Sequence, residues 1–331
     1  MALDLPLIFT MLMGLAILAY VILDGFDLGV GILLPLAVRE EQDMMVASIG
    51  PFWDANETWL VLGVGILLVA FPHAHGVILP ALYLEVAVML ISLILRGVSF
   101  EFRVKASGWH QSMWNHLFFV GSLGAAIAQG AMLAGVITGF KGGALYIAFE
   151  LLVGVGLAGG YALLGATWLV IKTEGDLHRR ALRWAYGAVV LAAVGVAAIS
   201  LATPFASASM MEKWFAWPRL LWLSPLPLLT AAAFAGILVS LTRLQRGKSK
   251  REWLPFVLSV WIFVFAFGGL AYSLFPYLVV DRLTIWQAAA ARESLMFVFV
   301  GTCVVLPMII GYTVFSYRVF WGKARSLTYG E

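Results

Sequence analysis

Long apolar runs separated by short polar links occupy nearly the whole chain. A helix needs about 20 mostly apolar residues to cross the roughly 30 Å hydrocarbon core of a bilayer. The runs therefore predict an all-α integral membrane protein with nine transmembrane helices, joined by links too short to form a separate soluble domain. The predicted spans are 7–34, 52–71, 77–97, 115–138, 144–171, 180–202, 219–242, 254–275 and 293–317.

Composition agrees with this pattern. Of 331 residues, 62% are apolar and only 12% are charged, with a mean hydropathy of +0.96. A soluble domain carries about a quarter charged residues, so this surface is expected to face membrane lipids. The single Cys303 excludes a disulfide within the chain. No phosphate-binding loop, zinc spacing or nucleotide fingerprint is present. The formal charge of +3 is small and says little by itself, and we expect no nucleic-acid partner.

The distribution of Lys and Arg predicts the orientation. Cytoplasmic loops of membrane proteins carry an excess of these residues. With nine spans, sixteen of the 21 fall on the side opposite the N-terminus, and that side is expected to be cytoplasmic. The N-terminus is then external and the C-terminus cytoplasmic. The five on the N-terminal side are Lys141, Lys213, Arg219, Arg282 and Arg292.

Two carboxylates occur in the inner half of the first span. Asp24 and Asp27 are three residues apart and share a helical face. Gly25, Gly29 and Gly31 surround them and let a neighbouring helix approach closely. Two interpretations stay open, because charges inside a membrane mark either a functional path or polar groups that hydrogen-bond an adjoining helix or a cytoplasmic Arg.

The second span begins with a polar cluster. The apolar part after Trp59 is too short to cross, so the helix is expected to begin near Pro51 and to include Asp54 and Glu57 in its first turns. Carboxylates there are stabilised by the helix dipole. Paired carboxylates beside the amide of Asn56 can also pass protons through water. Asp54 is the first candidate for such a proton path, followed by Glu57, Asp27 and Asp24.

Charged residues also gather where the third span leaves the membrane. Arg96, Glu101 and Arg103 lie within eight positions of one another. We expect them to form an ion-pair cluster at the level of the lipid headgroups that anchors the helix.

The histidines argue against an intramembrane cofactor bound by this chain. A haem in the bilayer is usually held by an axial His, Met or Cys from a helix. All five histidines, at 73, 75, 110, 116 and 178, fall in or beside predicted loops. We therefore expect no haem and no metal site in this polypeptide.

Four sequence blocks resemble subunit II of cytochrome bd-type quinol oxidases. They are GFDLGVG at 25–31, WDANETWLVLGVG at 53–65, RGVSFEFR at 96–103 and GGYALLGATWLVIKTEGDL at 159–177. The first three lie in order at span ends, and the nine-span length fits the same family. The short loops resemble the cyanide-insensitive type.

The resemblance implies a complex in the bacterial cytoplasmic membrane that oxidises quinol and reduces O₂ to water. Subunit I of such complexes carries haem b and haem d, whereas subunit II binds no haem. The implied fold is two four-helix bundles, here 1–138 and 144–275, plus a ninth helix at 293–317. A structural quinone in subunit II and a small single-span accessory subunit are features of some members.

The family assigns part of the cytoplasmic proton route to the Asp of the W-D-x-N-E block, which is Asp54 here. Two other hypotheses remain from the residues alone. Intramembrane Asp24, Asp27 and Glu85 would suit a stand-alone proton-coupled secondary transporter. A structural scaffold without a proton role is the third.

Overall fold

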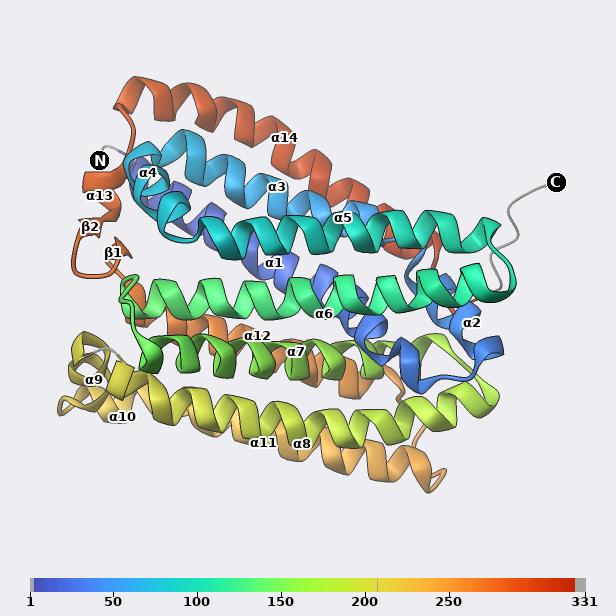
Figure 1. Ribbon diagram of the computed structural model, residues 1–331. Helices are drawn as coiled ribbons and strands as arrows, with labels where there is room; N and C mark the ends of the chain where they lie inside the picture. Colours follow the sequence, from blue (N-terminus) through green and yellow to red (C-terminus); the bar gives the residue numbers. More distant parts are fainter. Residues whose placement is uncertain (1–2, 207, 325–331) are drawn as a thin grey trace.

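The computed structural model describes residues 3–206 and 208–324, and within this part nine helices are long and apolar enough to cross a membrane. They lie side by side, with short helices and a small hairpin at the ends (Figure 1). The spanning helices are α1 (Leu5–Leu33), α3 (Trp53–Ala70), α5 (Tyr83–Lys105), α6 (Gly108–Thr138), α7 (Ala144–Lys172), α8 (Gly175–Ala206), α11 (Pro225–Gln245), α12 (Trp253–Leu274) and α14 (Arg292–Val319).

Shorter elements occupy the two ends. One end holds the helix α2 (Arg39–Ile49), and the 3-10 turn Leu34–Leu36 links it to α1. The opposite end holds α4 (Pro72–Ala81), α9 (Ala208–Phe215), α10 (Arg219–Leu223), α13 (Ile285–Ala288) and the antiparallel strands β1 (Tyr277–Val279) and β2 (Leu283–Thr284).

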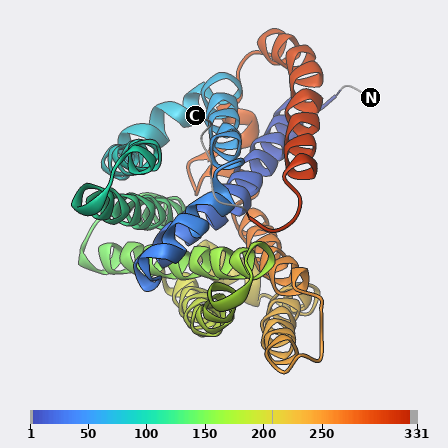
Figure 2. The ribbon, with the colours of Figure 1, turned by 90° about the vertical axis from the view of Figure 1, so that its right-hand side faces the viewer.

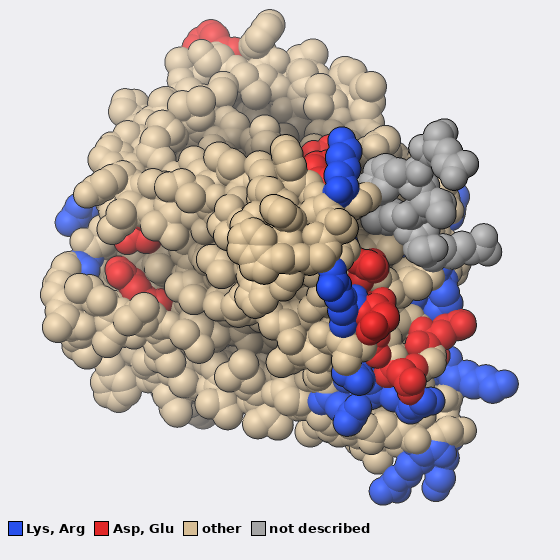
Figure 3. Space-filling view, turned by 45° about the vertical axis from the view of Figure 1, so that its right-hand side comes forward, with Lys and Arg blue, Asp and Glu red and all other residues tan. Residues whose placement is uncertain are grey.

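We call the end with α2 the basic end, because most Lys and Arg side chains lie there. Figure 3 shows Lys, Arg, Asp and Glu gathered at this end, with a broad uncharged surface beside them. Arg325, one of the sixteen residues counted on this side, lies outside the described residues.

Several predicted boundaries were wrong. The predicted loop at 72–76 is the helix α4, and the third spanning helix begins at Tyr83 and continues to Lys105, well past the expected end at 97. α6 begins at Gly108, seven residues before the expected start. Hydropathy detects the part of a helix inside lipid, whereas α5 and α6 continue as helices beyond it.

The closest helix contacts involve the glycines of α1. A Cβ at Gly29 would overlap the Tyr161 carbonyl oxygen of α7, and one at Gly25 would stand 2.8 Å from the Tyr161 ring. A Cβ at Gly31 would stand 2.7 Å from the Cβ of Ser122 in α6. All three glycines therefore pack against other helices of this chain. In lipid the hydrophobic effect does not drive helices together, so they associate through close packing, which small residues allow.

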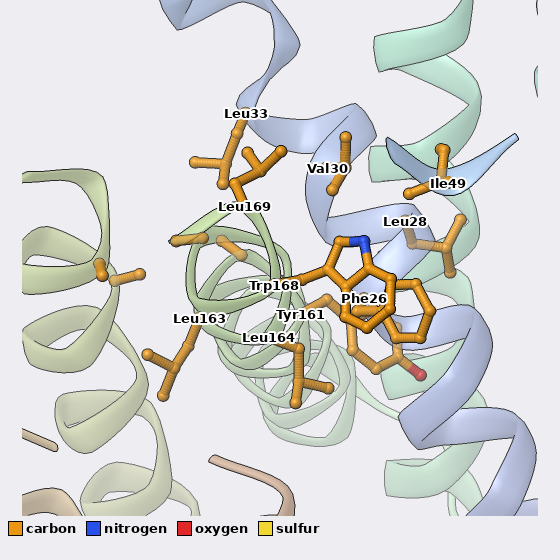
Figure 4. Close-up of a cluster of buried hydrophobic side chains, with 14 of the residues drawn as sticks. Phe26, Leu28, Val30, Leu33, Ile49, Tyr161, Leu163, Leu164, Trp168 and Leu169 are labelled. Atoms are coloured by element: carbon orange, nitrogen blue, oxygen red, sulfur yellow. The ribbon is translucent and has the colours of Figure 1, made fainter. Parts of the chain in front are cut away.

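The main core lies between α1 and α7. Phe26 stacks on Trp168 with ring centroids 4.2 Å apart, and Leu164 packs nearby (Figure 4). This core includes residues from both predicted four-helix bundles, 1–138 and 144–275. The division into two bundles stays a prediction.

The ninth helix is the most exposed. Only 6% of the most apolar stretch of α14 is buried, against 50% for α6 and α7. α14 packs mainly on α1 and α3 at the edge of the helix array (Figure 2). Its outer face is left for lipid or another chain.

Candidate functional site

Arg96 is the centre of a buried ion cluster near the basic end. Its side chain is 1% exposed and donates to Asp24 Oδ1 at 2.6 Å and to Glu57 Oε1 at 2.5 Å. The guanidinium carbon Cζ of Arg96 lies over the Trp53 ring, 5.7 Å from the ring centroid. Because a buried charge needs a hydrogen-bonded partner, α1, α3 and α5 are joined through this one side chain.

A glycine on α6 sets the position of Arg96. A Cβ at Gly121 would stand 2.6 Å from the Ser92 carbonyl oxygen and 2.9 Å from the Arg96 backbone nitrogen. α5 therefore approaches α6 through backbone contact, with Ser92 and Arg96 at the contact.

Asp27 belongs to a second hydrogen-bonded group beside Arg96. Asn56 Nδ2 donates to Asp27 Oδ2 at 2.8 Å and to the Leu23 carbonyl oxygen at 3.2 Å. The Tyr317 hydroxyl of α14 donates to Asn56 Oδ1 at 3.1 Å. Every polar atom of the Asn56 side chain is thus occupied, and the ninth helix is connected to Asp27 through it.

The carboxyl groups outnumber the cations in this cluster. Asp24 and Asp27 are fully buried and Glu57 is 29% exposed, with Arg96 the cation among them. If all three acids were ionised, two excess negative charges would lie in a low-dielectric region, which is costly. Asp24 Oδ2 and Asp27 Oδ1 also have no hydrogen-bond partner among the described residues. The cluster is chemically suited to bind and release a proton.

Asp54 lies outside this cluster. It is in the first turn of α3, one turn before Glu57, and its side chain is exposed in this chain. The predicted start of the helix near Pro51 is two residues early, because Trp53 is its first residue. Of the four acids predicted as a proton path, Asp24, Asp27 and Glu57 are together, and Asp54 lies at the surface.

The prediction that Arg96, Glu101 and Arg103 form one ion-pair cluster was wrong. Positions seven apart on a helix share a face, whereas Glu101 lies about 140° around the helix from Arg96. Arg103 is buried and donates to Asp43 Oδ1 of α2 at 2.6 Å and to Asn115 Oδ1 at 2.8 Å. Glu101 is exposed and has no ion pair within the described residues.

Sequence reasoning missed two partners of this site. Asn56 was noted only as a neighbour of the acids, and Tyr317 carried no signal because it lies 261 positions from Asn56. In the described part of the chain, no group of three or more His, Cys, Asp or Glu side chains is arranged to hold a metal ion.

Within the described residues, nine helices long and apolar enough to span a membrane and a charged cluster buried between them define a multi-pass membrane protein with ionisable groups inside its helix array. A family model described as cytochrome bd terminal oxidase subunit II matches residues 5–320. The chain belongs to this family. It is accordingly a multi-pass protein of the bacterial inner membrane and a subunit of an oxidoreductase complex that includes subunit I.

Two relatives extend along nearly the whole chain. Cytochrome bd-I ubiquinol oxidase subunit 2 of Escherichia coli (strain K12) is 27% identical over 367 aligned residues, covering 96% of this chain and 94% of the relative. Cytochrome bd ubiquinol oxidase subunit 2 of Bacillus subtilis (strain 168) is 28% identical over 329, covering 93% and 94%. These matches are to oxidase subunits and give the transporter hypothesis no support.

A solved structure shares the fold. The structure of bd oxidase from Geobacillus thermodenitrificans contains a chain that superposes with a TM-score of 0.79 at 16% identity, covering 96% of this chain and 99% of the other. The nine-helix arrangement is therefore that of a bd oxidase chain.

Proposed function

We propose that this chain is the haem-free subunit of a quinol-oxidising bd-type oxidase, in which it stabilises the haem-bearing subunit I and contributes to proton uptake from the cytoplasm. The observation that carries the proposal is the buried set of Asp24, Glu57 and Arg96 near the basic end. O₂ reduction to water consumes protons, and a buried acid close to the cytoplasmic surface can supply them.

The proposed path starts at Asp54. This exposed carboxylate precedes the half-buried Glu57 by one helical turn, and Glu57 is bonded to the same guanidinium as the fully buried Asp24. Exposure thus decreases stepwise from Asp54 to Asp24, as expected for a route that takes protons from water into the protein. Asp27 and Asn56 form a branch of the same set.

The histidines support the absence of haem in this chain. His73 and His75 lie in α4, His110 and His116 in the first three turns of α6, and His178 in the first turn of α8. All are at the ends of helices. Haem b and haem d are therefore assigned to subunit I.

The stabilising role rests on the open surface of α14 and α3. A groove of about 910 Å³ is lined by Leu62 of α3 and by Met296, Phe297 and Leu306 of α14, and Arg292 and Glu293 are its charged lining residues. Such an apolar face suits packing on subunit I, on lipid or on the tail of a structural quinone. A single-span accessory subunit would also need such a face.

Substitution of Asp54 tests the proton role. Asp54→Asn keeps the shape of the side chain but cannot titrate, so quinol oxidation by the assembled complex should slow by on the order of 10²-fold with the haem content unchanged. Asp54→Glu should keep part of the rate. Glu40→Gln, an exposed acid of α2 at the same end, is the matched control and should behave as wild type. Wild-type turnover and full haem in Asp54→Asn would leave the chain as a scaffold.

A further inference from the structure

A chain of three buried polar side chains lies next to the ion cluster, outside the set described above. Gln129 of α6 donates through Nε2 to the Tyr20 hydroxyl of α1 at 2.7 Å. Its Oε1 accepts from the Tyr161 hydroxyl of α7 at 2.6 Å. The three residues are between 0% and 9% exposed, so both ends of a buried amide are satisfied by tyrosines from two other helices.

The two hydrogen bonds among these three side chains have the same direction, from Tyr161 through Gln129 to Tyr20. Tyr161 donates to Gln129, and Gln129 donates to the oxygen of Tyr20. The Tyr20 hydroxyl therefore still has its own hydrogen to donate. A buried hydroxyl hydrogen without an acceptor is costly, so it needs one nearby.

A candidate acceptor lies on the same helix. Tyr20 and Asp24 are four residues apart on α1, so their side chains lie on the same face of the helix, and both are buried. Arg96 occupies Asp24 Oδ1, whereas Asp24 Oδ2 is buried without a partner among the described residues. The free hydrogen and the free oxygen are complementary.

The close contact between α1 and α7 at Gly25 leaves room for the Tyr161 side chain that bonds to Gln129. The Tyr161 ring lies directly over Gly25, where even a Cβ would stand 2.8 Å from it. Gly25 thus leaves the space through which the Tyr161 hydroxyl reaches Gln129. A larger residue at 25 would push the ring away from α1.

We propose that Tyr20 is a positioning residue for Asp24, that Gln129 and Tyr161 hold its hydroxyl in place, and that this chain of donors keeps Asp24 oriented between Arg96 and Tyr20 for proton transfer. The proposal rests on the proton role proposed above. The other charged or titratable groups near Asp24 are Glu57 of α3, Asp27 of α1 and the hydroxyls of Tyr161 and Tyr317. Tyr20 supplies a neutral donor, whereas Arg96 supplies the charged one at Asp24 Oδ1.

Single variants of the assembled oxidase measure the effect. Tyr20→Phe removes the donor and keeps the ring, and Gln129→Leu removes the group that holds it. Because each change removes a group that orients the Asp24 carboxylate, each should lower kcat roughly tenfold or more, with KM for quinol and haem content unchanged. Tyr186→Phe removes a half-buried hydroxyl bonded to Thr242 and should leave kcat at the wild-type value.

A double-mutant cycle with Asp24→Asn separates positioning from general packing. If Tyr20 acts through Asp24, Tyr20→Phe should have little further effect on kcat in the Asp24→Asn background. A full additional loss there, or wild-type kcat in Tyr20→Phe alone, would overturn the positioning role. If Asp24→Asn itself turns over at the wild-type rate, the role of this carboxylate in proton uptake fails, and the positioning role fails with it.

Discussion

A Cβ atom at Gly165 of α7 would stand 2.8 Å from the Cα of Gly29 in α1 and 2.5 Å from the nitrogen of Val30. The two helices therefore touch through their backbones at this point. Both Asp24 and Asp27 lie within two turns of Gly29 on α1, so the backbone contact fixes the height and rotation of the acids relative to α7.

Gly29→Leu is expected to reduce the yield of the assembled, haem-loaded complex severely. Adding methylenes to a packed side-chain contact costs about 1–3 kcal/mol, and here the neighbour is backbone, which cannot rotate away. Gly187→Leu in α8 is the control, because a Cβ there meets nothing within 4 Å. Recovery of Gly29→Leu at the level of the control would mean that α1 and α7 separate without loss.

Arg96→Leu should destabilise the complex more than any substitution of an exposed arginine. Removing one partner of a buried ion pair leaves the other charge uncompensated, at a cost of about 3–5 kcal/mol. Arg96→Lys keeps the charge but not the forked geometry, so an intermediate loss is expected. The thermal midpoint of the purified complex measures both, with the exposed Arg183→Leu as control. A midpoint for Arg96→Leu equal to that of the control would contradict this view.

The helices could be predicted from hydropathy because the bilayer fixes their length, and charges inside them stood out against the apolar runs. Asp24, Asp27 and Glu57 were identified for this reason. α2 was not predicted, because an 11-residue polar helix at the surface resembles a loop in hydropathy.

An arginine partner for Asp24 was one of the interpretations from the sequence, but which arginine it would be could not be predicted. Arg96 lies 72 positions from Asp24 and 39 from Glu57, and nothing local indicates that they meet. Counting from one end of α5 placed Arg96 with Glu101 and Arg103 at the headgroups. Arg96 instead faces inward, toward Asp24 and Glu57, where α5 packs on α6 at Gly121.

The segment after α14 should be held mainly by Lys172. This lysine is 5% exposed, donates to the Phe320 carbonyl oxygen at 2.8 Å and lies over the Phe52 and Trp168 rings. Lys323 also reaches back, to Glu252 at 2.6 Å, but that pair is about one-third exposed. Exposed pairs contribute about 0–1 kcal/mol, whereas cation–π contacts are stronger when desolvated.

Hydrogen exchange at the Ala324 amide, which donates to the Lys172 carbonyl oxygen, can separate the two contributions. We expect exchange to be much faster in Lys172→Met and only slightly faster in Lys323→Met. The reverse order would assign the attachment to the exposed pair.

The orientation of the chain decides whether Asp54 can take protons from the cytoplasm. Lys141 and Lys248 are both exposed, and they lie at opposite ends of the helix array. In a Cys303→Ala background, Lys141→Cys should react with a membrane-impermeant thiol reagent on intact cells. Lys248→Cys should react only after the membrane is opened, since the basic end is expected to be cytoplasmic. α3 begins at the basic end, so Asp54 is on the same side as Lys248. If Lys248→Cys were the variant labelled on intact cells, Asp54 would face the external side, and it could not serve cytoplasmic proton uptake even if Asp54→Asn slowed turnover.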